Sequence, residues 1–295
     1  MTPRRFTPLG RVLCVDEFHT GLDGWCALIG NHRGDTTQVQ DRMADLRPPH
    51  LSTLPFFDIG SHGSGFGGYA MKLMTRPRAG SCAMAIKRLT SVADTTIRFE
   101  CYLAYKSDPA ASTPAGADDE WDGNADPGEA AFGEFVLSND IVSLERGTRA
   151  HCAIRYANTH HDGSLVQRWE YKTSLQPTTK MVRAGLAPEN GPFHTVHGDD
   201  WRPLPGGAEQ RLCYNETATK VNWHYLGWTF SSRTMRNVSL QVNDRIWDLS
   251  EVAVPTYPDS YTGLRGLLNF LVDVRTTTNS RNTLYLDSCC ISADW

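Results

Sequence analysis

The stretch that decides the fold is Ile97-Arg98-Phe99-Glu100-Cys101-Tyr102-Leu103, in which apolar and polar side chains alternate. Successive side chains of a β-strand point to opposite faces of a sheet. The apolar side chains of this stretch would therefore share one face, and Arg98, Glu100 and Tyr102 would share the other. This period-two pattern is typical of a strand with one buried face.

The same alternation recurs along the chain, while no long amphipathic helix is evident. We expect at least seven strands, the other six within 132–138, 150–156, 166–172, 223–230, 238–243 and 284–291. Glycine and proline supply 25 and 16 residues, which fits many turns. The pattern predicts an all-β protein with two packed antiparallel sheets, a sandwich, barrel or jelly roll.

Two long insertions interrupt the strand pattern, near residues 107–131 and 187–210. The first holds seven acidic residues, no basic ones and three prolines, so it cannot pack a core. Strand patterns resume on both sides of it. We therefore expect one domain over residues 1–295, with these segments as long loops.

Composition limits the classes of partner. The formal net charge of −4 argues against a nucleic-acid binder, because phosphate neutralisation needs a basic surface. No stretch reaches the roughly 18 apolar residues of a membrane span. The start lacks the apolar region of a secretory signal, so we expect a cytoplasmic protein with eight free thiols. Because exposed sheet edges are often covered by dimerisation, a homodimer is a further hypothesis.

Three segments resemble the concanavalin A-like lectin/glucanase superfamily, whose fold is a two-sheet jelly roll. They are Val15–Phe18 with Gly21–Trp25, Asn222–Leu226 with Arg236–Asp244, and Asn282–Ser292. The first looks like the opening strand of such domains, and the last is similar to the closing strand that pairs with it. The turn at Asn243-Asp244 departs from the Asn-Gly or Asp-Gly of related lectin folds, although both residues tolerate such a turn.

The whole chain also resembles an uncharacterised bacterial family described as a domain of unknown function. The segments Phe56–Ser64 and Lys220–Tyr225 carry this second resemblance. It implies a bacterial source and no known activity.

The superfamily contains glycosidases and polysaccharide lyases, which makes paired carboxylates the first candidates for catalysis. The Glu-x-Asp-x-x-Glu strand of its retaining glucanases does not occur here. A pair could come from neighbouring strands instead, and Glu100 and Glu134 each lie on the polar face of a predicted strand. They would act as general acid or base, with His62 in a glycine-rich loop as the runner-up. Surface or ion-paired carboxylates are the alternative interpretation.

Aromatic and charged side chains on predicted polar strand faces could bind a sugar on a concave sheet face. The candidates are Arg98, Tyr102, His151, Arg155, Trp169, Tyr171 and Trp223. The rings among them could equally belong to the core. The sequence therefore predicts a carbohydrate-binding or carbohydrate-active protein, glycosidase-like, lyase-like or lectin-like. The alternative is a non-catalytic structural or assembly protein of the same fold, in which a partner subunit seals these side chains.

Metal binding is a third hypothesis. The string His194–Asp200 has ligand-like residues, but it lies in a Gly/Pro loop where histidines are usually solvated. Some jelly rolls of the resembled class hold a structural calcium ion near the paired first and last strands. Asp16, Glu17 and Asp287 would be the local carboxylates. Calcium needs six to eight oxygen ligands, which a sequence cannot count, so its presence stays open, and no other cofactor is expected.

Overall fold

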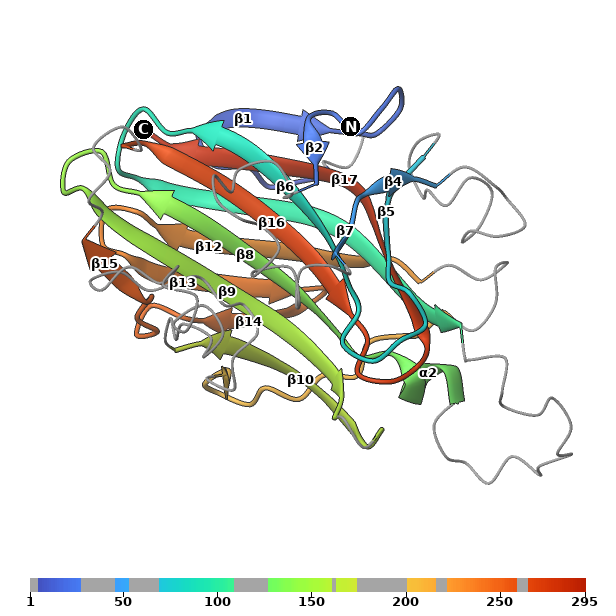
Figure 1. Cartoon of the computed structure of the whole chain (residues 1–295). Coiled ribbons are helices and arrows are strands. Elements are labelled where there is room, and N and C mark those ends of the chain that lie inside the picture. The colour runs from blue at the N-terminus through green and yellow to red at the C-terminus, as the bar shows by residue number, and fades with distance from the viewer. Residues whose placement is uncertain are drawn as a thin grey trace, which may run out of the picture.

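The computed structural model describes residues 5–27, 46–52, 69–108, 127–160, 163–173, 201–215, 222–258 and 265–295. Strands dominate these residues, and the one described helix is the short α2 (Pro127–Ala131). Figure 1 shows the strands arranged in two layers. The prediction of an all-β fold with two antiparallel sheets is confirmed.

Sheet A has eight strands and contains the stretch that decided the fold. Its order is β14 (Arg245–Asp248), β13 (Arg236–Val242), β12 (His224–Ser231), β7 (Thr96–Asp108), β17 (Arg281–Asp294), β5 (Met71–Met74) and β4 (His50–Leu51). The eighth strand, β1 (Arg11–Asp16), pairs with β17 antiparallel, from Arg11 opposite Ala293 to Asp16 opposite Cys289. The predicted adjacency of the first and last strands is therefore confirmed.

Sheet B has nine strands and packs on sheet A. Its order is β11 (Trp201–Pro203), β10 (Leu165–Lys172), β9 (Thr148–Thr159), β8 (Glu134–Val142), β16 (Leu267–Arg275), β6 (Cys82–Thr90) and β2 (Trp25–Cys26). Two short strands complete it: β15 (Thr256–Pro258) beside β9, and β3 (Leu46–Arg47), which runs parallel to β6. The strand β11 lies inside the predicted loop 187–210. A strand of three residues is too short to show a sequence period.

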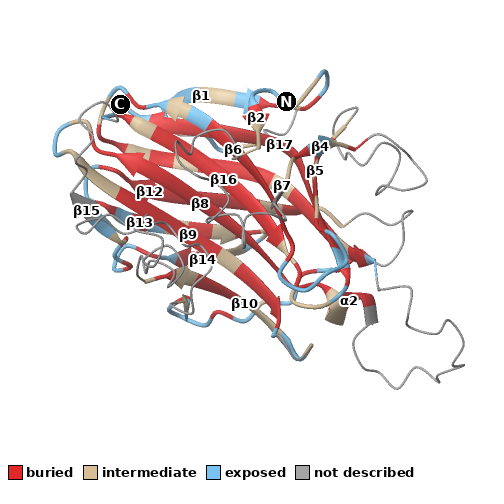
Figure 2. Cartoon of the chain, in the orientation of Figure 1, coloured by how far each residue is buried: buried red, intermediate tan, exposed pale blue. Residues whose placement is uncertain are grey.

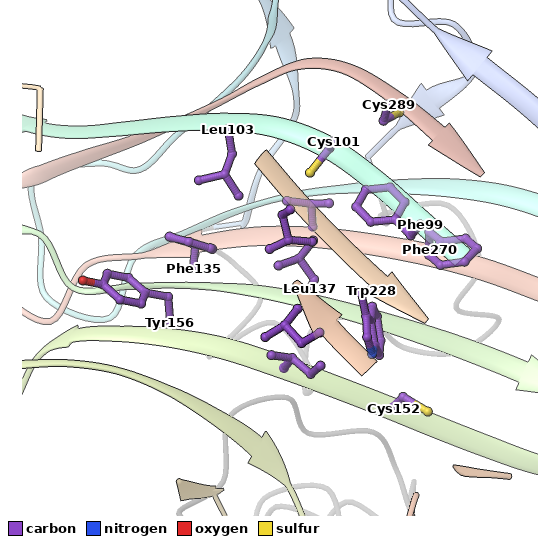
Figure 3. Close-up of a cluster of buried hydrophobic side chains, with 14 of the residues drawn as sticks. Phe99, Cys101, Leu103, Phe135, Leu137, Cys152, Tyr156, Trp228, Phe270 and Cys289 are labelled. Atoms are coloured by element: carbon purple, nitrogen blue, oxygen red, sulfur yellow. The ribbon is translucent and has the colours of Figure 1, made fainter. Parts of the chain in front are cut away.

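The core lies between the sheets and is built by the inward face of each strand. Figure 3 shows Phe99 and Cys101 of β7, Trp228 of β12 and Phe270 of β16 directed into this layer. The rings of Phe99 and Phe270 stack across the two sheets, with centroids 5.4 Å apart. Burial of such aromatic surface is the main contribution that holds the layers together.

The two sheets differ on their outer faces. In sheet B every residue of β8 is buried, as are the central residues of β16, so both faces of these strands are covered. Figure 2 shows β6, β16, β8 and β9 red over most of their length. Polar side chains on the outer face of sheet B are consequently withdrawn from water, and they need partners there.

Candidate functional site

The candidate site is the outer face of sheet B, where side chains alternate with those that build the core. Strand register places residues of β16, β8, β9 and β10 side by side on this face. Its polar members are Glu134, Ser138, Asp140, His151, Arg155, Arg168, Glu170, Lys172, Asn269, Asp273 and Arg275. A buried sheet face with this density of charge is unusual, because ionised groups lose hydration when they are covered.

Glu134 lies between two guanidinium groups. Its Oε2 is 3.0 Å from Arg155 Nη1, and its Oε1 is 3.1 Å from Arg275 Nη1. Arg155 also donates from Nε to Glu170 Oε2 at 2.6 Å, and Arg168 reaches the other oxygen of Glu170 at 2.6 Å. Register explains the network, since Glu134 is opposite Arg275 and Arg155 is opposite Glu170. The four chain segments are thus tied by alternating charge.

Asp273 lies on β16 beside this network. It is opposite Val136, which places it diagonally from Glu134. Burial raises the pKa of the Asp273 carboxyl well above its usual range, and the nearby negative charge of Glu134 raises it further. The site therefore combines an ion-paired carboxylate with a carboxyl group that favours its protonated form. A protonated carboxyl can donate a hydrogen bond or a proton.

Trp201 of β11 lies over the same face. The Arg155 guanidinium carbon is 4.6 Å from the centroid of its ring, and Lys172 Nζ is 5.3 Å from it. The ring also packs against Val136 and Ala153. Cations near an aromatic face are attracted by the ring quadrupole, so these contacts hold the indole in place.

His151 and Asp140 lie opposite each other further along β9 and β8. Arg149 donates from Nε and Nη2 to the two oxygens of Asp140, at 2.7 and 2.5 Å. The structure therefore brings three predicted site residues together on one face: Glu134, His151 and Arg155.

The outer face of sheet A carries the other predicted cluster. Glu100 is fully buried, and its Oε1 accepts hydrogen bonds from Thr7 N–H at 2.8 Å and Tyr225 O–H at 2.5 Å. Arg98 Nε is 3.4 Å from the same oxygen. Glu100 thus anchors the N-terminal segment across the sheet.

Two neighbours shape this anchor. Gly227 of β12 is opposite Glu100, and a Cβ at Gly227 would lie 2.6 Å from Arg98 Nη2, so glycine leaves room for the guanidinium. Tyr102 donates from its hydroxyl to the carbonyl of Arg5 at 3.0 Å. Arg98, Glu100 and Tyr102 therefore share a face, as predicted, but the chain itself occupies it.

Glu100 and Glu134 do not form a pair, which corrects the idea that these rows converge. Glu100 lies on β7 of sheet A, and Glu134 lies on β8 of sheet B. The side chains point to the two outer faces, with the core between them. Alternation along a strand assigns faces, but it does not say which strands are neighbours.

The aromatic side chains predicted to bind a sugar pack against other parts of the protein. Trp169 is buried in the core and donates from Nε1 to Gln210 Oε1 at 2.8 Å, and Tyr171 packs against the same core. Trp223 packs near Tyr285 and Ala104. The period-two pattern grouped Trp169 and Tyr171 correctly, but their shared face is the inward one, and the alternating Arg168, Glu170 and Lys172 point outward.

The carboxylates suggested for calcium have protein partners. Lys87 Nζ lies 3.0 Å from Asp16 Oδ2 in a buried ion pair, and Glu17 Oε1 lies 3.0 Å from Arg5 Nη1. An ammonium group thus takes the place beside Asp16 that a metal ion would need. Within the described residues, no group of three or more His, Cys, Asp or Glu side chains could hold a metal ion. His62 and the string 194–200 lie outside those residues.

Sequence reasoning missed Asp273, Glu170, Arg275 and Trp201. Asp273 and Arg275 lie on β16, whose sequence LLNFLVDVR mixes polar residues into an apolar run. The signal that could have found Asp273 is a carboxylate within a run too apolar for an exposed strand.

The chain belongs to a family described as a domain of unknown function, DUF6772, whose model matches residues 2–295. No curated protein sequence matches it. Among the described residues, no helix has the length and apolar character needed to cross a membrane.

Solved structures of similar fold have low sequence identity to this chain. One belongs to a report on endo-acting O-glycanases that members of the human gut microbiota express to initiate mucin breakdown, with 12% identity, 96% of this chain and 100% of that chain covered, and a TM-score of 0.38. Another is the potassium-bound carbohydrate recognition domain of Emp46p, at 9% identity, 89% and 93% coverage, and a TM-score of 0.39. A third is winged bean acidic lectin with methyl-α-D-galactose, at 9% identity, 84% and 92% coverage, and a TM-score of 0.38. All three scores lie below 0.5, so the similarity does not identify a shared function.

Proposed function

We propose that this DUF6772 protein binds a carbohydrate at the edge of the outer face of sheet B where Arg155, Arg168 and Trp201 are partly exposed. The observation that carries the proposal is the buried network of Glu134, Arg155 and Glu170 under the indole of Trp201. A sugar-binding face needs fixed polar groups for hydroxyls and a ring or apolar surface for the C–H groups of the sugar. This face offers both.

Catalysis on this face would centre on Glu134. Of the two predicted acids or bases within the described residues, Glu134 lies on the outer face of sheet B and Glu100 on that of sheet A. Both of its oxygens already contact guanidinium groups, so they are engaged in ion pairs of the protein. Binding is therefore the first expectation, and bond cleavage is a second step to be tested on any glycan that binds.

The test is a binding screen of the full chain against neutral and acidic oligosaccharides. We expect Trp201→Ala to weaken a hit about tenfold or more, a loss of about 1.4 kcal/mol in binding free energy. Arg98→Ala, on the outer face of sheet A, is the matched control and should bind as the wild type does. Thermal melts must show that both variants fold. A hit would then be incubated with wild type and Glu134→Gln, and cleavage lost only in the variant would assign an enzyme.

The alternative function is a non-catalytic assembly protein whose sheet B face is sealed by a second copy. The observation that favours it is the mutual pairing of the charges, because paired charges need no ligand. In that case the wild type would be a dimer by light scattering, Arg155→Ala would shift it to a monomer, and the glycan screen would find no hit. A monomeric wild type that binds a glycan would exclude this alternative.

A further inference from the structure

The edge of sheet B at β9 and β10 presents positive charge to solvent, while the matching carboxylates lie beneath it. The side chain of Arg168 is 34% exposed and that of Arg155 is 21% exposed. Glu170, which pairs with both, is only 1% exposed, and Glu134 is 9% exposed. A ligand that reaches this edge therefore meets guanidinium groups before it meets carboxylates.

Strand register brings the two guanidinium groups together. Glu170 of β10 is opposite Arg155 of β9, and Arg168 lies two residues before Glu170 on the same face. Diagonal neighbours on adjacent strands are about 7–8 Å apart. Arg155 contacts one oxygen of Glu170 and Arg168 contacts the other, each at 2.6 Å. One buried carboxylate thus holds two arginines side by side.

Each of these arginines keeps one nitrogen of its guanidinium group available. Arg155 uses Nε for Glu170 and Nη1 for Glu134, so its Nη2 has no hydrogen-bond partner among the described residues. Arg168 uses Nε and Nη2 for Glu170, which leaves its Nη1 in the same position. Neither nitrogen is one of the buried atoms that lack a partner in the described part of the chain, so both reach solvent. Their N–H groups can therefore bind an acceptor from outside the protein.

The charge around this edge is positive as well. Among the described residues there, four cations stand against two carboxylates: Arg155, Arg168, Arg275 and Lys172 against Glu134 and Glu170. Asp273 does not restore the balance, since an excess of one cation remains even when it is ionised. Burial and the charge of Glu134 also raise the pKa of Asp273 well above its usual range, which favours its neutral form. An anion is thus the ligand that this charge attracts.

Trp201 supplies an apolar surface beside the arginines. Its side chain is partly exposed, and the Arg155 guanidinium carbon lies 4.6 Å from the centroid of its ring. Its strand β11 and the neighbouring β10 lie at the margin of sheet B farthest from β6, and Figure 1 shows β10 there. An aromatic surface can pack against the C–H groups of a sugar. The ring and the available N–H groups therefore share one margin of the sheet.

From these observations we infer that this edge recognises an acidic oligosaccharide, with an oxyanion of the ligand on Arg155 and Arg168 and a sugar ring beside Trp201. The inference rests on the proposed carbohydrate function and adds the class of ligand. A guanidinium group suits this task, because its planar fork matches the oxygens of a carboxylate and it is less strongly hydrated than an ammonium group. A neutral oligosaccharide would use the ring but not the charge.

Arg168 is the residue that should separate acidic from neutral ligands. Among the described residues its side chain contacts only Glu170, and Glu170 keeps its ion pair with Arg155 when Arg168 is replaced. Arg155 links Glu170 to Glu134, so its loss would disturb the buried network. Arg168→Gln therefore removes one partly exposed charge and leaves both carboxylates paired.

The test measures binding of the full chain, by calorimetry, to a uronic-acid oligosaccharide and to a neutral one of matched length. We expect the acidic ligand to bind about tenfold more tightly or better at low salt, and high salt to reduce this preference through screening. Arg168→Gln should weaken acidic binding about tenfold and leave neutral binding unchanged. Arg168→Lys keeps the charge but lacks the fork, so it should show a smaller loss, and it carries the test if the glutamine variant does not fold.

Arg88→Gln is the matched control. Arg88 is an exposed arginine on the same face, opposite Asn269 on β6. Four strand spacings separate β6 from β10, which corresponds to about 19 Å. This variant removes the same charge from the face without touching the site, so binding of both ligands should stay as in the wild type.

The outcomes separate this inference from the proposed function. A neutral oligosaccharide that binds as tightly as the acidic one would overturn the acidic class and leave carbohydrate binding standing. Acidic binding that falls equally in Arg168→Gln and Arg88→Gln, or in neither, would overturn the position of the site. If no oligosaccharide binds at all, the proposed function fails, and the inference fails with it.

Discussion

Replacing Lys87 with methionine should cost this protein a large part of its stability. Lys87 extends from β6 toward Asp16 at the end of β1, and its Nζ lies 3.0 Å from Asp16 Oδ2. The two residues are only 8% and 4% exposed. Nζ also donates to the backbone carbonyl of Asp23. The ammonium group thus ties the first strand of sheet A to sheet B.

The magnitude follows from what Lys87→Met leaves behind. Asp16 would keep the hydrogen bond from Trp25 Nε1, at 2.9 Å, and the weak contact of Cys289 Sγ, at 3.7 Å, but it would lose its counter-charge. Removing one partner of a buried ion pair typically costs about 3–5 kcal/mol. Because a domain has about 5–15 kcal/mol of stability in total, the substitution should remove between about a fifth and all of it.

Urea titration of folded protein measures this loss, and two further variants make it specific. Asp16→Asn combined with Lys87→Met leaves no uncompensated charge, so it should regain most of the stability. Lys106→Met breaks the more exposed pair with Asp108, at 3.3 Å, and should change stability by less than about 1 kcal/mol. A Lys87→Met protein within 1 kcal/mol of wild type, or a double variant no more stable than the single one, would refute the reasoning.

Three other predictions concern pH, the last strand and the thiols. The pKa of Asp273 is raised in the folded state, so its proton stabilises the fold, and this contribution is lost as pH rises above about 4, by at most about 1.4 kcal/mol per pH unit. Urea titrations at pH 5 and pH 8 should therefore show a smaller loss of unfolding free energy in Asp273→Asn than in the wild type. An identical loss in both proteins would contradict the burial of a protonated carboxyl. Deletion of residues 284–295 should abolish cooperative melting, because β17 pairs with β7, β5 and β1. Removal of Trp295 alone should leave cooperative melting intact. A protein without residues 284–295 that melts like the wild type would contradict the structural role of β17. Thiol titration of protein denatured without reductant should count eight, and a mass two units below the reduced value would contradict it.

The strands that the sequence predicted are those with one face toward the core and a polar outer face. Residues 97–103 belong to β7, and 223–230 overlap β12, which pairs with it. The central strands β6 and β16 were missed because both of their faces are buried, which removes the polar–apolar period. Asp273 was missed for the same reason.

The neighbours of each strand were beyond sequence reasoning. β7 lies between β12 and β17, which are more than 100 residues further along the chain. No local pattern encodes such pairings. Glu100 and Glu134 therefore looked equivalent as polar-face carboxylates, and only the sheet order separates them. Arg155 and Glu134 were both predicted for the site, but their ion pair depends on the adjacency of β8 and β9.

The two outer faces use their polar side chains differently. On sheet A, Thr7 and Tyr225 satisfy Glu100 Oε1, and the N-terminal segment is further held by Leu9 N–H on Ser292 Oγ at 3.0 Å. That face uses its polar atoms to bind its own chain. On sheet B, Ser138 Oγ, Asn269 Oδ1 and Asp273 Oδ1 are buried atoms without a hydrogen-bond partner. Buried atoms without a partner also occur on sheet A, at Arg98 Nε and Glu100 Oε2. The two faces therefore differ in what their other polar atoms bind: the N-terminal segment on sheet A, and one another in the ion pairs of Glu134 and Glu170 with Arg155 on sheet B.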